Sequence, residues 1–183
     1  LRILGWHEMM NDTLGGVPVA LAYCTLCGSG ILYETRVPGR DAPLVFGSSG
    51  LLYRSNKLMF DWETKSLWTQ FTGRPVVGPL TPSGIALKTR PLVVTDWVDW
   101  RRRHPDTTVL SRDTGHLRDY RSGAAYADYF ADPGLMFPAA SGTAAEDSDG
   151  SPGPKDLVFG IVRFAAARAW PLAAFAGGRV IND

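Results

Sequence analysis

The chain has 183 residues, 45% of them hydrophobic, and a formal net charge of +1 at pH 7. This length and apolar content suit one domain of ordinary size with a buried core. The near-neutral charge gives no electrostatic reason to expect nucleic acid as a partner, and no apolar run of about eighteen residues predicts a membrane span.

The N-terminal part of the chain alternates between apolar segments and turns. Residues 1–12 predict a short helix that ends at Asn11-Asp12, before a Gly15-Gly16 turn. Residues 17–23 are apolar on both faces of an extended chain, which is typical of a buried strand. Further strands are predicted in three places. They are a hairpin over 31–46, a strand over 51–60 and a strand over 67–71.

The later part of the chain holds the clearest helix, over residues 95–103. Thr95 or Asp96 can cap its first turn, and three arginines favour its C-terminal end. Strands are predicted over 107–111 and 157–164, and a surface loop over 139–154. With 20 glycines and 13 prolines, the chain predicts a mainly β fold, a β-sandwich or barrel of short antiparallel strands with one or two short helices.

The two ends of the chain resemble each other. Residues 172–183 align without gaps on residues 1–12, and both segments end in Asn-Asp. We therefore predict a first β module over 1–164, which carries the cysteines, and the start of a second, truncated copy over 165–183.

The chain's only cysteines, Cys24 and Cys27, form a CxxC motif at the end of the predicted buried strand. This spacing allows the two sulfurs to bond each other or to bind one metal ion. The absence of a second cysteine pair argues against finger-type zinc. The Gly28-Ser29-Gly30 turn and the strand after it argue against a thioredoxin motif, and Gly28 in place of histidine argues against haem attachment. A metal site, a disulfide or redox pair, and two inert buried thiols remain open.

His7 is the histidine best placed to complete a site with the two cysteines. A soft ion suits this donor set, so the metal hypothesis is a Cys24, Cys27 and His7 site, with copper favoured over zinc. Weaker candidate ligands are Glu8, Met9, Met10 and His116. One competing hypothesis is a non-enzymatic interaction module with a structural Cys24–Cys27 disulfide. Another is a thiol-dependent redox protein or enzyme in which His7 assists a cysteine. Neither a small-molecule nor a protein partner can be named from the sequence.

Several stretches together resemble a bacterial and archaeal family catalogued as domain of unknown function 3179. The stretches that carry the resemblance are Trp6-His7-Glu8, Tyr23-Cys24-Thr25-Leu26-Cys27-Gly28, Ser55-Asn56, Ser66-Leu67-Trp68, His104-Pro105-Asp106-Thr107 and Arg118-Asp119-Tyr120. The resemblance implies an extracytoplasmic protein that is secreted, periplasmic or lipid-anchored, and often a second module without the CxxC. The family usually has proline where this chain has Thr25. Its name implies no reaction.

Overall fold

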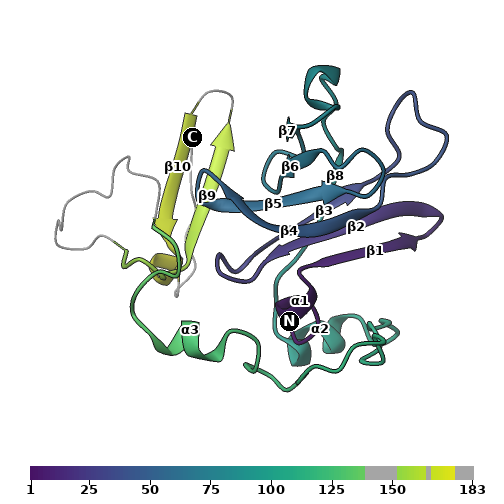
Figure 1. Cartoon of the computed structure of the whole chain (residues 1–183). Helices are drawn as coiled ribbons and strands as arrows, with labels where there is room; N and C mark the ends of the chain where they lie inside the picture. The colour runs from purple at the N-terminus through teal and green to yellow at the C-terminus, as the bar shows by residue number, and fades with distance from the viewer. Residues whose placement is uncertain (139–151, 164–165, 176–183) are drawn as a thin grey trace. The chain divides into compact units, whose positions relative to one another are not determined.

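A computed structural model describes residues 1–138, 152–163 and 166–175 of the chain (Figure 1). The chain divides into two compact units, Leu1–Ala127 and Asp128–Asp183. The described strands form open antiparallel sheets, and the described helices are short. The predicted mainly β fold is therefore confirmed, and no sheet among the described strands closes into a barrel.

The first sheet carries the CxxC motif. Its order is β1-β2-β3-β8, and its strands are β1 (Met9–Leu14), β2 (Val17–Cys24), β3 (Ser29–Glu34) and β8 (Thr89–Arg90). Strand β2 lies between β1 and β3, pairs with both and is buried along much of its length, as its apolar sequence predicts. Cys24 is its last residue and pairs with Ser29 of β3, so the CxxC spans the turn between these two strands.

The second sheet has the order β4-β5-β6-β7. Its strands are β4 (Phe46–Tyr53), β5 (Asn56–Asp61), β6 (Leu67–Thr69) and β7 (Pro75–Val77). The single strand predicted over 51–60 is wrong, because Arg54 and Ser55 both have positive φ and turn the chain between β4 and β5. A two-residue turn of this kind matches the twist of a hairpin. It places Asn56 and Lys57 at the start of a buried strand.

The core lies among residues from both sheets. Trp68, Tyr33, Phe46 and Met59 are the largest fully buried apolar side chains, and the Phe46 and Trp68 rings meet edge to face with centroids 5.5 Å apart. The side chain of Asn11 in β1 also bonds the backbone of Phe46 in β4. Its Nδ2 donates to the Phe46 carbonyl and its Oδ1 accepts from the Phe46 N–H, each at 2.8 Å. These bonds join the edge strands of the two sheets.

The helix predicted over residues 1–12 is wrong in its extent. Helix α1 covers only Leu4–His7, and Met9 already belongs to β1. Glu8 has a φ of 58°, a left-handed conformation that ends the helix. Residues Met9–Leu14 then pair with Val17–Ala22 across the Gly15-Gly16 turn, and these pairing bonds stabilise a strand where the apolar spacing alone suggested a helix.

Two further elements belong to the first unit. Helix α2 (Trp97–Arg103) confirms the predicted helix, and Asp96 caps it by accepting from the Asp99 N–H at 2.8 Å. A short 3-10 turn, η1, covers Thr81–Ser83. The strand predicted over 107–111 is absent from the structure, where this segment has no regular secondary structure.

The described residues of the second unit form one hairpin and two short helical segments. Helix α3 (Ala127–Ala131) begins at the last residue of the first unit. Strands β9 (Val158–Arg163) and β10 (Ala166–Pro171) pair antiparallel, and the 3-10 turn η2 (Leu172–Phe175) follows. Strand β9 agrees with the strand predicted over 157–164. Among the described residues, no helix has the length and apolar character needed to cross a membrane.

Two predictions fall partly outside the described residues. Residues 139–151 of the predicted surface loop are not described. Of the proposed repeat, only residues 172–175 are described, so the repeat and the predicted boundary at 164/165 stay predictions.

Candidate functional site

Cys24 and Cys27 are joined by a disulfide, with their Cα atoms 5.3 Å apart. The two cysteines differ in exposure, because Cys24 is only 3% exposed whereas Cys27 is exposed. The turn between β2 and β3 accounts for this difference. Cys24 still lies in the buried strand, and Cys27 follows it by three residues at the surface, before Gly28 at a φ of 61°. Solvent therefore reaches one end of the disulfide and not the other.

A pair of buried amide side chains lies behind the exposed sulfur. Asn56 Nδ2 lies 3.7 Å from Cys27 Sγ and 3.0 Å from Gln70 Oε1, so it can donate to both. Gln70 is fully buried, and its Nε2 donates to the carbonyls of Ala22 and Ser29, on either side of the CxxC turn. Strands β2, β3 and β5 are thus connected directly beneath the disulfide.

Two buried polar atoms at this amide pair form no hydrogen bond with any described residue. Within the part of the chain that the structure describes, Asn56 Oδ1 and Ser29 Oγ are both buried and without a partner. An unpartnered buried polar atom costs free energy, so the place where it persists is a candidate for function. Here both atoms belong to residues that surround the disulfide.

His7 lies at the end of α1 and contacts residues far along the chain. Its Nε2 is 2.5 Å from the hydroxyl of Tyr120, and that hydroxyl is also 2.5 Å from Thr114 Oγ1. The ring of His116 lies 5.1 Å from that of His7, centroid to centroid. Burial lowers the pKa of His7, and the nearby charges of His116 and Arg118 lower it further. His7 is thus held mainly as the neutral imidazole at pH 7.

The segment that contains His7 is attached on both sides of Cys24. The Tyr23 N–H donates to the carbonyl of Glu8 at 2.7 Å, and the Thr25 hydroxyl donates to the carbonyl of Gly5 at 3.1 Å. These bonds hold the backbone of α1 against the CxxC. The imidazole itself is engaged by Tyr120 through Nε2.

Glu8 forms a second polar cluster, with Ser48 and Lys57. Its Oε2 lies 2.6 Å from Lys57 Nζ and accepts from the Ser48 hydroxyl at 2.7 Å, and Lys57 Nζ lies 2.9 Å from Ser48 Oγ. Burial lowers the pKa of Lys57, although the hydrogen bond and the charge of Glu8 oppose that shift. Burial also raises the pKa of Tyr126, and Glu8 adds to the shift.

The structure distributes the predicted site residues among these clusters. Cys24 and Cys27 are bonded to each other, His7 lies beside His116, and Glu8 pairs with Lys57. Met9 and Met10 begin β1, and Met9 packs against the core. No group of three or more His, Cys, Asp or Glu side chains is placed to hold a metal ion among the residues of known placement. Copper binding by Cys24, Cys27 and His7 therefore stays a prediction for the reduced chain.

Sequence reasoning missed the partners of these residues. Asn56, Gln70, Lys57 and Tyr120 were assigned no role, although the Ser55-Asn56 and Arg118-Asp119-Tyr120 stretches carry part of the family resemblance. The family resemblance was the signal that could have identified them, because these residues belong to no catalytic or metal-binding motif and to no periodic pattern.

One of three comparisons with known proteins identifies a family for this chain. The family described as "Protein of unknown function (DUF3179)" matches residues 1–183. No curated protein and no solved structure matches the chain.

Proposed function

The chain belongs to the DUF3179 family, whose description names no reaction, and we propose from its geometry that it is a thiol–disulfide exchange protein. The observation that carries this proposal is the asymmetry of the disulfide. Cys27 is exposed and lies 3.7 Å from an amide donor, Asn56 Nδ2, whereas Cys24 is buried. An exposed sulfur can be attacked by a substrate thiolate, and a donor beside it stabilises the Cys27 thiolate once the disulfide is reduced.

A purely structural role explains the disulfide less well. In the chain-entropy treatment, closing a loop of about four residues stabilises a protein by only about 2 kcal/mol. The same turn is already closed by the pairing of Cys24 with Ser29 and by the bond from Thr25 to the Gly5 carbonyl. The disulfide adds little restraint to this turn, which leaves it free to act as a redox group.

The two sulfurs have different roles in the exchange. A substrate thiolate attacks Cys27 Sγ, the Cys24–Cys27 bond breaks, and Cys24 leaves as a thiolate that takes up a proton. A second substrate thiolate then attacks the substrate sulfur of the mixed disulfide and releases Cys27. Two electrons and two protons pass from two substrate thiols to the protein, and the substrate leaves as a disulfide. The reverse sequence would reduce a substrate disulfide.

Asn56 contributes to this chemistry by hydrogen bonding. Its Nδ2 donates toward Cys27 Sγ, and Gln70 Oε1 fixes the orientation of the amide at 3.0 Å. A hydrogen bond to the ionised form of a group lowers its pKa. Asn56 therefore favours the thiolate of Cys27 in the reduced chain and makes Cys27 the better nucleophile of the pair at neutral pH.

Copper binding is the second candidate function, and it concerns the reduced state. The Cα separation of 5.3 Å would let both thiolates reach one soft ion, and the bonds that hold α1 against the CxxC bring the backbone of His7 to the same region. Coordination through His7 Nε2 would require the Tyr120 hydroxyl to move, whereas Nδ1 carries no such bond to Tyr120.

We further propose that the protein works outside the cytoplasm. Disulfides persist in oxidising compartments and are rare where glutathione and thioredoxin keep thiols reduced. A disulfide that cycles through an exposed Cys27 fits the secreted, periplasmic or lipid-anchored location that the family resemblance implies.

The test compares the two single-cysteine variants. We expect the lone Cys27 of the Cys24→Ser variant to react with glutathione disulfide at least about tenfold faster than the lone Cys24 of the Cys27→Ser variant, because reactivity follows exposure and thiolate character. Wild-type protein equilibrated in glutathione buffers should show a reversible two-electron transition by mass. A disulfide that resists excess dithiothreitol, or equal reactivity of the two thiols, would contradict the proposal and favour the structural disulfide of an interaction module.

The copper candidate needs a separate experiment. Reduced protein is dialysed against Cu(I) without oxygen, and the bound metal is counted. One ion per chain that is lost in Cys24→Ser and in Cys27→Ser would support the site, and weaker binding in His7→Ala would add the imidazole to it. The matched control is His104→Ala, a histidine at the end of α2.

A further inference from the structure

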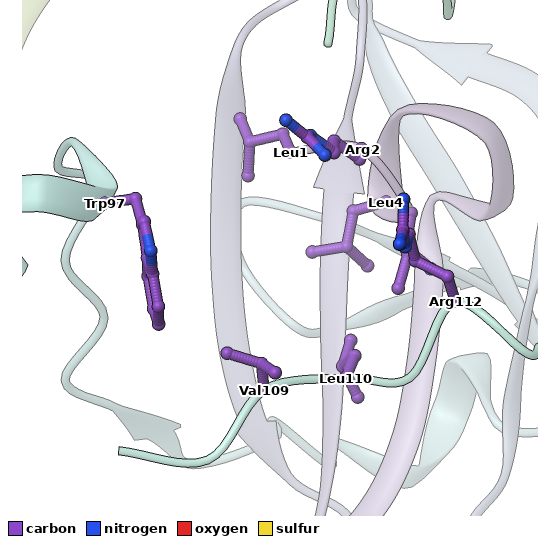
Figure 2. A pocket seen from close by; sticks show the side chains of 8 residues that line it. Leu1, Arg2, Leu4, Trp97, Val109, Leu110 and Arg112 are labelled. Carbon is purple, nitrogen blue, oxygen red and sulfur yellow. The ribbon is translucent and has the colours of Figure 1, made fainter. Parts of the chain in front are cut away.

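A cavity of about 570 Å³ lies in the first unit, and neither cysteine lines it. Segments from three parts of the sequence form its wall: the start of the chain, the first turn of α2 and the irregular segment around 109–112 (Figure 2). The residues that line it are Leu1, Arg2, Ile3, Leu4, Trp97, Val109, Leu110 and Arg112. Its volume lies within the range of small-molecule sites.

The apolar part of this wall is unusually accessible to solvent. Val109 is 69% exposed, Leu1 64% and Trp97 50%, although each is a large hydrophobic side chain. Single exposed apolar residues are ordinary. Several that line one hollow indicate a surface that a ligand or a partner covers. The aliphatic side chains of Leu4, Val109 and Leu110 border the cavity together in Figure 2. They offer a surface for an aliphatic chain.

Two arginines are the charged side chains among the described residues of this lining. Arg2 and Arg112 belong to it, and no acidic residue does. Within the described part of the chain, neither guanidinium forms an ion pair with a carboxylate. Figure 2 shows the nitrogen atoms of both side chains toward Leu1 and Leu4, whereas Val109 and Leu110 lie toward the opposite side. The cavity therefore combines an apolar wall with positive charge on one side.

We propose that this cavity binds an aliphatic carboxylate with a single chain, of the fatty-acid class. The carboxylate lies against Arg2 and Arg112, because a guanidinium offers paired N–H donors in the geometry of a carboxylate. The aliphatic chain covers Leu4, Val109, Leu110 and the indole of Trp97, and so removes exposed apolar surface from water. The site is distinct from the cysteine site and does not depend on the proposed redox function.

The test uses calorimetric titration of the whole chain with sodium dodecanoate below its micelle concentration. We expect saturable binding of one dodecanoate per chain. Dodecanol should bind at least about tenfold more weakly, and dodecyltrimethylammonium should not bind, because both lack the negative head group. Equal affinity for dodecanoate and dodecanol, or a lack of saturation, would overturn the proposal.

Three variants connect the binding to the cavity. Arg2→Gln and Arg112→Gln should each weaken dodecanoate binding about tenfold, the effect of losing one charged hydrogen-bonded contact of about 1.4 kcal/mol. Val109→Asp should abolish binding by placing a carboxylate in the wall, and it leaves the fold intact because Val109 is 69% exposed. Arg101→Gln is the matched control, since Arg101 lies on α2 but outside the cavity lining. Binding that all three cavity variants retain would place the ligand elsewhere.

Discussion

The ammonium of Lys57 lies 2.6 Å from the Oε2 of Glu8, and this ion pair joins two segments 49 residues apart. The Lys57 side chain is 6% exposed and that of Glu8 is 20% exposed. The pair links the residue that ends α1 to β5, the strand that also carries Asn56. An ion pair removed this far from water is costly to form, and it is more costly to break by deleting one partner.

Replacing Lys57 with methionine should therefore destabilise the protein strongly. The change leaves the Glu8 carboxylate half-buried without its cation, and we expect the free energy of unfolding to fall by about 3 kcal/mol. The double variant Glu8→Gln/Lys57→Met removes both charges and should lose less than Lys57→Met alone. Urea denaturation of the three proteins measures both effects.

The surface offers a matched control for this prediction. Lys88 pairs with Glu34 at 3.0 Å, but the Lys88 side chain is 72% exposed. Lys88→Met should change the free energy of unfolding by less than about 1 kcal/mol, as is usual for surface ion pairs. A Lys57→Met protein as stable as the Lys88→Met protein would show that the buried pair adds no more than a surface one.

The elements that were predicted well are those whose signals are local. Strand β2 is apolar on both faces over consecutive residues, and α2 has its capping aspartate, Asp96, directly before its first turn. Such signals lie within a few residues of the element they define. The helix predicted over 1–12 is wrong in its extent because the left-handed Glu8 ends the helix and pairing with β2 makes the following residues a strand. The spacing of apolar residues indicates neither of these.

The candidate site was predictable only in its covalent part. The CxxC spacing itself brings Cys24 and Cys27 close enough to bond. The Asn56 amide reaches Cys27 from 29 residues away, and the Tyr120 hydroxyl reaches His7 from 113 residues away. Contacts of this kind depend on how distant segments pack in the fold. No periodic pattern in a single sequence indicates them.

The stability of the protein should depend on pH through His7. Burial, together with His116 and Arg118, lowers the pKa of His7 below 6.5 in the folded chain. The unfolded chain therefore binds more protons between the folded pKa and 6.5. The contribution of His7 to stability is complete above pH 6.5 and is lost as the pH falls toward the folded pKa.

A set of thermal unfolding curves between pH 5 and pH 7 measures this dependence. We expect the melting temperature of the wild type to rise with pH across that range, and the His7→Gln protein to show a shallower rise. Glutamine can still accept from the Tyr120 hydroxyl, so the fold around α1 is retained. His104→Gln serves as the control, because His104 lies at the end of α2, where its ring stacks near Trp100. If the melting temperatures of the wild type and of His7→Gln rise equally with pH, the pH dependence of stability does not come from His7.

The last prediction concerns Asn56 and the reactivity of Cys27. Asn56 Nδ2 is the side-chain donor that lies 3.7 Å from Cys27 Sγ, and one hydrogen bond contributes about 0.5–1.5 kcal/mol. Asn56→Leu should therefore raise the pKa of the reduced Cys27 thiol and slow its alkylation at pH 7 about two- to tenfold. The pH dependence of iodoacetamide alkylation in the Cys24→Ser background gives the thiol pKa and the alkylation rate separately.

The control for Asn56 is a neighbouring polar residue that has no contact with sulfur. Ser49 donates to the Leu58 carbonyl at 2.6 Å from the adjacent strand β4, so Ser49→Ala should leave the alkylation midpoint of Cys27 unchanged. A midpoint that moves equally in both variants would reflect a general loosening of the β4–β5 hairpin. A midpoint that moves only in Asn56→Leu assigns the effect to the amide, since Gln70 holds that amide in place beside the sulfur in the native chain.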